Sequence, residues 1–313
     1  MAMTLAESAK YSQEYLYPKV VEEILKVSPI LTKIPFVEVR GTALRVDYED
    51  ESNPSTVNFY GPNEQIVGGE GLLLQRDFSL TRLIGDAQVD NLLRKSRSNP
   101  IDIMAEQLKL KSKAMAHKFE KTLIYGGTPL TNEFNGLHSS SILVAGQTVK
   151  LGTVATGAPL TTTALDQMLD LVAVGGMPDV IVMNRNILRR LSAYLRTLGS
   201  HQSERDEYGN LWTSWQGVPI AASDFITQLE AIATDATYDS TGVGVTSTVF
   251  ALRFGAGDGL VGIQSGSIAT EKFGNLENFD GTKIRLKWYC GMALYQSKAI
   301  AAITGVTDAA VSA

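Results

Sequence analysis

Three histidines are the residues most able to supply acid–base chemistry or metal ligands, and their placement favours neither. His117, His138 and His201 lie in three separate stretches, and no two of them have the spacing of ligands on one element. No carboxylate is paired with any of them by sequence position. The Ser/Thr-rich segment 139–163 lacks the Gly-x-Ser-x-Gly turn of a nucleophilic serine. The sequence therefore predicts no catalytic and no metal-binding residue, and the protein is not expected to be an enzyme.

Residues 257–262 read Gly-Asp-Gly-Leu-Val-Gly and are the one match to a dinucleotide-binding pattern. That pattern requires a helix that begins at the glycines, so that its first amides face the pyrophosphate. Here the β-prone run Ile-Gln-Ser-Gly-Ser-Ile-Ala-Thr follows instead. We therefore expect a hairpin turn and no bound cofactor, and a nucleotide-binding oxidoreductase is only a remote alternative.

The composition is that of an ordinary globular protein. The chain has 313 residues, of which 44% are hydrophobic and 19% charged, with a net charge of −5. This acidity argues against a protein whose main task is to bind nucleic acid. The one cysteine, Cys290, excludes an internal disulfide and is expected in the core. No apolar run is long enough to span a bilayer and no signal peptide is evident, so synthesis in the cytoplasm is expected.

A long helix is predicted between Ser98 and Gly127, and the other elements must be arranged around it. Ser98 or Asn99 can cap it, Pro100 suits its first position, and two glycines end it. One apolar stripe runs along it, formed by Ile101, Met104, Leu108, Met115, Phe119 and Leu123. Its other faces carry Lys109, Lys111, Lys113, Lys118 and Lys121, against only Glu106 and Glu120. This basic face is either simply solvated or close to a polyanion.

Before this helix, the sequence predicts a long projecting hairpin. Residues 43–48 and 74–84 alternate apolar and polar side chains, as strands with one covered face do. The connection 49–73 is rich in Asn, Pro, Gly and Ser, and a loop of this length is usually functional or disordered. It cannot bury its own apolar residues, which are Val57, Phe59, Tyr60, Ile66 and Val67. A neighbouring surface is therefore expected to cover them.

The remaining segments predict an α/β lobe and further strands. An amphipathic helix is expected at 11–27, and a second short helical turn at 30–33. In the lobe, helices are expected at 163–174 and 185–198 around a buried strand at 178–184, and a loop at 204–215. Strands are expected at 218–222, 246–254, 260–263, 267–273, 283–292 and 299–304. We expect the end of the chain to return to sheet structure beside the long helix.

The order of these parts resembles the major capsid proteins of tailed bacteriophages with the HK97-type fold. The residues that carry the resemblance are the hairpin between Leu44 and Asp86, the helix end Lys118–Gly127 followed by Asn135-Gly136-Leu137, the strand Pro178–Asn184, the run Gly217–Ile220 with Ser223-Asp224, and the closing run Lys283–Tyr289. Each piece is unspecific by itself, but their order and spacing together cover nearly the whole chain.

The resemblance implies an α+β fold and a division of the chain. Residues 1–41 would be an N-terminal arm with a short helix, and residues 42–88 the extended loop that lies across the adjacent subunit. Residues 89–150 would form the peripheral domain with its spine helix, and residues 151–264 the axial domain, whose loops meet at the symmetry axes. Residues 265–313 would return to the peripheral domain.

The implied function is self-assembly. The chain would form hexamers and pentamers of an icosahedral virion shell around double-stranded DNA, with a portal protein and, where present, separate scaffolding or decoration proteins as partners. Contact with the packaged DNA would be weak and nonspecific, and no membrane is involved. The nearest alternative is an encapsulin-like nanocompartment, which shares the fold and encloses cargo enzymes. The chain begins at its arm without a long leader, so any scaffold is expected to be a separate protein.

One departure from the family is informative. Some members join subunits through an isopeptide bond between a loop lysine and an asparagine of the peripheral sheet, promoted by a glutamate. Here residues 41–77 contain no lysine, and residues 283–292 contain neither asparagine nor glutamate. We therefore expect a shell that is held by noncovalent contacts alone.

Overall fold

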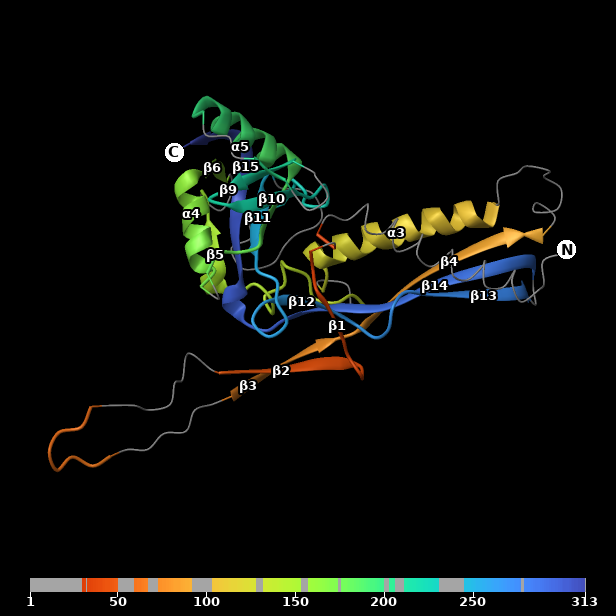
Figure 1. The fold of residues 1–313 in the computed structure, drawn as a ribbon, viewed down its shortest axis with the longest axis horizontal. Coiled ribbons are helices and arrows are strands. Elements are labelled where there is room, and N and C mark those ends of the chain that lie inside the picture. Colours follow the sequence, from red (N-terminus) through yellow and green to blue (C-terminus); the bar gives the residue numbers. More distant parts are fainter. Residues whose placement is uncertain are drawn as a thin grey trace.

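The structure is a computed structural model that describes residues 30–31, 33–49, 59–66, 73–91, 103–127, 132–152, 157–173, 176–199, 203–205, 211–230, 245–276 and 279–312. The helix expected at 11–27 lies outside these residues. A turn does occupy residues 30–34, where the amides of Lys33 and Ile34 both donate to the carbonyl of Ile30. The described chain forms two packed sheets and a separate two-stranded hairpin (Figure 1).

The first sheet has five strands and supports the long helix. Its members are β1 (Phe36–Glu38), β4 (Thr81–Asp90), β12 (Leu260–Gln264), β13 (Ala269–Leu276) and β14 (Phe279–Leu294). The long strand β14 pairs antiparallel with β4, β12 and β13, and β1 joins the edge parallel to β12. Helix α3 (Ile103–Tyr125) lies along one face of this sheet (Figure 1). Even-numbered residues of β14 from Ile284 to Cys290 are buried on that face.

Helix α3 confirms the main expectation about the long apolar stripe. Its 23 residues span about 35 Å at 1.5 Å per residue. Leu108, Met115, Phe119 and Leu123 are all buried against the sheet, whereas the side chains of Ile101 and Met104 lie outside the described part. The helix ends at the expected glycines, where Gly127 adopts a left-handed φ of 95°.

The charged faces of α3 differ from expectation at one residue. Lys109, Lys113, Lys118 and Lys121 are exposed and Lys111 is half-buried. Glu120 was expected among them, but it is buried and accepts a hydrogen bond from the Ser223 hydroxyl at 3.0 Å. Sequence spacing could not show this, because the segment that covers Glu120 is about a hundred residues away in the chain.

The second sheet has eight strands and carries both lobe helices. Its order is β5-β15-β11-β7-β10-β9-β8, with β6 beside β15. The bounds are β5 Thr148–Lys150, β6 Ala158–Thr161, β7 Val180–Met183, β8 Ser203–Arg205, β9 Leu211–Trp215, β10 Val218–Ala222, β11 Ser247–Leu252 and β15 Ile300–Ser312. The helices are α4 (Thr162–Leu171) and α5 (Arg185–Thr197), with short 3-10 turns η1 (Ala145–Gln147) and η2 (Ser297–Ala299).

The central strand β7 faces a different core on each side. Ile181 and Met183 pack with α4 and α5, whereas Val180 and Val182 belong to the larger core that also contains the buried stripe of α3. All four residues are fully buried, as the unbroken apolar run predicts for a strand that is covered on both faces. The lobe is therefore joined to the five-stranded sheet through one continuous apolar core.

Four expectations about strands need correction. The run 74–84 is two strands, because the chain leaves one sheet at Leu80 and enters the other. The stretch 204–215 includes the hairpin of β8 and β9 instead of forming only a loop. Strand β12 pairs with β14 in the five-stranded sheet, although 151–264 was expected to form the lobe. Of the closing runs that were expected beside α3, β14 does lie there, whereas β15 pairs with β11 in the lobe. Alternation identifies a strand, but only long-range pairing decides its sheet. The division into assembly domains itself stays a prediction.

Candidate assembly interface

The projecting loop is the feature that separates this chain from a self-contained globule. Strands β2 (Ala43–Glu49) and β3 (Leu73–Ser79) pair antiparallel along their full lengths. At the base, Val46 and Phe78 are buried in the main core. Beyond it, the loop extends away from both sheets, and its described tip lies at the lower left of Figure 1. The base is thus anchored while the rest of the loop leaves the body.

Side-chain contacts stiffen the two strands of the loop. Arg45 makes a two-point ion pair with Asp77 across the strands, at 2.8 and 3.2 Å. The Arg76 guanidinium lies 4.4 Å from the centre of the Tyr48 ring. The Arg45–Asp77 pair is exposed and screened by solvent, so it contributes little stability and mainly fixes strand geometry. The guanidinium lowers the pKa of Asp77 by hydrogen bonding.

The tip of the loop contains a well-defined turn. The Glu64 amide donates to the Gly61 carbonyl at 3.2 Å, and Asn63 has a φ of 67°. A proline at the second position and a positive φ at the third are the signature of a type II turn. The Glu64 carboxylate also accepts the Gly61 amide at 2.7 Å and closes the turn. The tip is therefore shaped before any partner is met.

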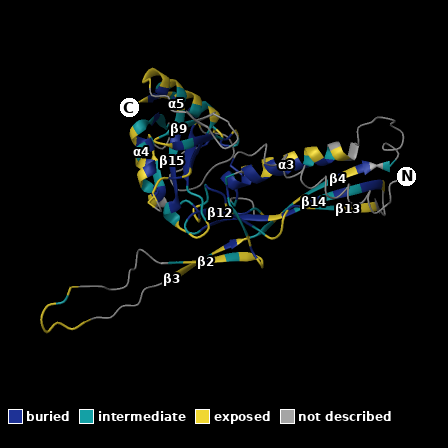
Figure 2. Cartoon of the chain, in the orientation of Figure 1, coloured by how far each residue is buried: buried dark blue, intermediate teal, exposed yellow. Residues whose placement is uncertain are grey.

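Large apolar side chains of the loop have no cover within the described chain. Phe59 is fully exposed, Ile66 is 76% exposed and Leu73 is 71% exposed. Figure 2 shows the described tip almost entirely in the exposed colour. Val57 and Val67 were expected in the same set but lie outside the described residues. Apolar side chains grouped on one projection are typical of a surface that a partner covers.

The loop also concentrates the negative charge of the protein. Residues 41–79 contain seven acidic residues and two arginines, a balance of −5 that equals the net charge of the whole chain. The remaining residues are therefore balanced overall. A surface that complements the loop must be basic.

Such a basic surface lies on the face of the five-stranded sheet that α3 leaves open. Three cations alternate along β14 on this face, at Lys283, Arg285 and Lys287. The cross-strand register places residues of β4 and β13 beside them on the same side, namely Arg82, Ile84, Asp86, Gln88, Glu271 and Phe273. Four cations stand against two carboxylates, and Ile84, Phe273 and Tyr289 add exposed apolar area.

Ion pairs organise this open sheet face. Asp86 accepts two hydrogen bonds from Arg285, at 2.7 and 2.9 Å, and pairs with the Lys283 ammonium. These hydrogen bonds hold the pKa of Asp86 far below its usual range, more than partial burial raises it. Lys287 pairs with Glu271 on β13. The pattern Lys-x-Arg-x-Lys in a strand could have revealed this face from sequence, but its carboxylate partners could not be foreseen.

The histidines do not come together. His117 meets the Phe225 ring edge-on at 5.3 Å, and His138 stacks on Tyr125 with its Nε2 3.4 Å from Glu230. His201 lies outside the described residues. Within the described part of the chain, no group of three potential metal ligands forms, and no helix is long and apolar enough to cross a membrane.

Residues 256–259 form a turn, but it is not the expected hairpin, because strands β11 and β12 on its two sides belong to different sheets. A bridge joins Phe254 to Leu260, and strand β12 follows where a dinucleotide site needs a helix. The third glycine, Gly262, has a packing role, because a Cβ atom there would lie 2.4 Å from the Phe36 ring. Cys290 is buried as expected, and its burial raises the pKa of the thiol to about 12.

Comparisons with known proteins agree with this architecture. Residues 85–238 match the family model of the SU10 major capsid protein. Among solved structures, the SrpI encapsulin complex from Synechococcus elongatus PCC 7942 is similar over 90% of this chain and 89% of its own, with 17% identity and a TM-score of 0.67. The chain has the HK97-type capsid fold, and its residues 85–238 match a family of major capsid proteins.

Two further solved structures extend the comparison. One that is titled Microbacterium phage Oxtober96 matches with 10% identity and a TM-score of 0.61, over 90% of each chain. The capsid of a native GTA particle matches with 14% identity and a TM-score of 0.58, over 89% of this chain and 90% of that one. A search of curated proteins gives no match. The family match and the shared fold support a capsid shell subunit, and the loop and the open sheet face are the surfaces with the features of an interface.

Proposed function

We propose that the chain assembles into hexamers and pentamers of an icosahedral shell, and that the shell encloses the double-stranded DNA of a tailed bacteriophage. The observation that carries this is the projecting loop, which places exposed apolar side chains and most of the chain's excess negative charge far from its own core. A subunit of this shape can bury that surface against copies of itself, and a closed shell gives every copy a neighbour to cover its loop.

In the proposed contact, the loop of one subunit lies on the open sheet face of the next. The acidic residues of the loop lie near the cations of that face, which are Arg82, Lys283, Arg285 and Lys287. The apolar residues Phe59 and Ile66 of the loop pack against its exposed apolar side chains, which are Ile84, Phe273 and Tyr289. Opposite net charges steer the encounter, and apolar burial holds the contact. Its strength should fall as ionic strength rises, because the charges are partly exposed.

The proposed shell is held without covalent links. The loop offers no lysine between residues 41 and 77, and residues 283–292 offer no asparagine or glutamate. Boiled particles should therefore run as a single band near 33.8 kDa on a denaturing gel. A ladder of covalent oligomers would disprove this part of the proposal.

An encapsulin-like compartment is the second candidate. The encapsulin structure named above matches this chain with a higher TM-score than the phage and GTA structures reported beside it. The two candidates differ in content, since one shell holds a genome and the other holds protein cargo. The exposed lysines of α3 would meet the DNA weakly and without sequence preference if they line the interior.

The experiment is expression of the full chain and negative-stain microscopy of the purified product, followed by analysis of nucleic acid in particles made during infection. Closed shells are expected. A product that consists of soluble monomers alone would overturn the proposal. Particles that contain long double-stranded DNA and a portal complex at one vertex would support a virion shell that has a portal protein as partner. Recovery of such particles from the cytoplasm of infected cells would support assembly there. Particles that carry protein cargo and no genome support the compartment.

A further inference from the structure

An eight-residue segment, here called the strap (residues 223–230), runs between helix α3 and the start of helix α5. Its first odd-numbered residues contact α3, in the pairs Ser223 with Glu120, Phe225 with His117, and Thr227 with Tyr125. The Ser223 hydroxyl donates to the Glu120 carboxylate at 3.0 Å, and the Thr227 amide donates to the Tyr125 hydroxyl at 2.8 Å. Both Ser223 and Glu120 are buried.

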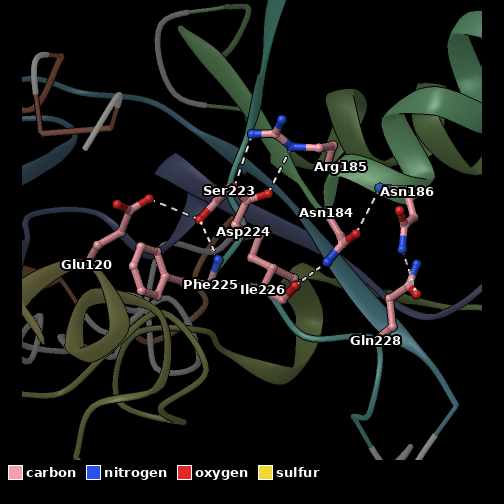
Figure 3. Close-up of polar contacts among 9 residues, drawn as sticks. All are labelled: Glu120, Asn184, Arg185, Asn186, Ser223, Asp224, Phe225, Ile226 and Gln228. Carbon is pink, nitrogen blue, oxygen red and sulfur yellow. Dashed lines mark hydrogen bonds and ion pairs between the residues drawn. The ribbon is translucent and has the colours of Figure 1, made fainter. Parts of the chain in front are cut away.

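The even-numbered residues of the strap bind the lobe instead. Their partners are the cap and first two residues of α5, in the pairs Asp224 with Arg185, Ile226 with Asn184, and Gln228 with Asn186. Arg185 donates to Asp224 at 2.9 and 3.0 Å, and Asn184 donates to the Ile226 carbonyl while it caps α5 (Figure 3). These contacts of the strap thus alternate between two elements over six residues, and the Ser223 amide adds one bond to the Met183 carbonyl of β7 at 3.0 Å.

The end of the strap is fixed by a buried carboxylate. Glu230 accepts from the Tyr125 hydroxyl at 2.7 Å and from the Thr248 hydroxyl of β11, and His138 lies 3.4 Å away. Its backbone also bridges Thr246 in both directions. Burial and the neighbouring Glu230 charge raise the pKa of Tyr125, so its hydroxyl keeps the proton it donates. One side chain therefore ties the end of α3 to the lobe sheet.

The hydrogen bonds of the strap differ in kind from the apolar contacts that also join helix α3 to the lobe. Apolar contact depends on buried area and has little directional preference, so packed surfaces can slide by small amounts. Hydrogen bonds require aligned donors and acceptors. A rotation of the lobe against α3 must therefore break the odd or the even set of strap bonds.

We propose that the strap fixes the angle between the spine helix α3 and the α/β lobe, and so sets the curvature of the shell that the subunit builds. The curvature part rests on the proposed function, because the shape of the subunit limits how strongly a shell of hexamers and pentamers can curve. The angle part concerns the free subunit alone.

The angle can be measured by pulsed electron spin resonance on full-length subunits. Spin labels at Lys113→Cys on α3 and Leu198→Cys after α5 occupy exposed positions on the two parts. Cys290 is buried and does not compete for the label. The parent protein should give one narrow distance distribution.

Each side of the strap is then released separately. Tyr125→Phe with Ser223→Ala removes bonds to α3, and Asn186→Ala removes a bond to α5. Both variants should broaden the distance distribution or add a second population. The control is Arg190→Ala, which removes an ion pair with Asp308 inside the lobe and should leave the distribution narrow. The double variant loses three hydrogen bonds between α3 and the strap, which are Ser223–Glu120, Thr227–Tyr125 and Tyr125–Glu230, so the equilibrium between lobe orientations should change about tenfold or more.

Wild-type distributions in both variants would overturn the strap's role. If the double variant does not fold by circular dichroism, Asn186→Ala alone decides the question, because its partner Gln228 is only half-buried. Shells from the variants should vary in diameter, whereas the control gives uniform shells. Broad distance distributions together with shells of uniform diameter would refute the claim that the strap sets the shell curvature, but would support the claim that it fixes the angle between α3 and the lobe. Absence of shells from the parent protein would refute the proposed function and leave the distance result standing.

Discussion

The projecting loop and the strap are both connecting segments, but only the strap finds contacts for its side chains within its own chain. The strap places its polar groups on two neighbouring elements of the same chain, with Ser223, Ile226 and Glu230 all buried. The backbone of the loop is equally well defined, with a closed type II turn and two paired strands, but Phe59 and Ile66 are exposed to solvent. Defined local structure without cover indicates that the missing contacts are in another molecule.

Removal of residues 52–68 gives the largest expected effect and tests the comparison directly. The described part of this segment contributes no residue to either core, so the shortened chain should fold and melt within a few degrees of the parent. It should form no stable shells, because the surface that reaches the neighbour is gone. Thermal unfolding and negative-stain microscopy check the two parts. Normal particles from the deletion variant would show that the loop is not needed for contact between subunits.

Two phenylalanines form a matched pair for the same contrast. Phe119 of α3 is buried, so Phe119→Ala should lower the free energy of unfolding by about 3–5 kcal/mol. Phe59 is fully exposed, so Phe59→Ala should change it by less than about 0.5 kcal/mol. Denaturant titration measures both values. Phe59→Ala should nevertheless raise the protein concentration needed for assembly, and equal assembly by the parent and this variant would contradict a docked loop.

Charge reversal on the open sheet face tests its proposed pairing with the loop. Arg82→Glu with Lys287→Glu should reduce assembly about tenfold or more at low salt, since like charges now face each other. The difference should shrink as salt is added. Lys109→Glu with Lys113→Glu on α3 makes the same change in net charge and serves as the control. Equal loss in both pairs would point to a general charge effect and not to this face.

The smallest effect concerns Asp86. Its folded pKa lies below the usual value of 3.8, so the stability it contributes is complete above that value and is lost as the pH falls toward the folded pKa. Asp86→Asn should cost about 1 kcal/mol near neutral pH, and this difference should narrow between about pH 4 and pH 2. Urea titrations at several pH values measure it. A difference that stays constant with pH would show that the ion pairs are not its source.

The local elements of this protein follow from its sequence. Proline and glycine signals with a 3.6-residue apolar period predict α3, and its apolar stripe from Leu108 to Leu123 is buried as expected. The unbroken apolar run at 180–183 predicts a strand with two covered faces. The absence of lysine from residues 41–77, the absence of asparagine and glutamate from residues 283–292, and the apolar residues of the loop could likewise be read directly. These features depend on residues that are close in the chain, where backbone geometry links sequence to structure.

Only the tertiary structure decided which distant segments meet. It placed β15 in the lobe, moved Glu120 from solvent to a buried bond with Ser223, and aligned three cations of β14 beside Asp86 and Glu271. It also revealed the alternation of the strap, since the partners of residues 223–228 lie between 39 residues (Asp224 to Arg185) and 108 residues (Phe225 to His117) away. The physical reason is the same throughout. Periodicity fixes which face of an element is apolar, whereas the free energy of packing the whole chain selects the surface against which that face lies.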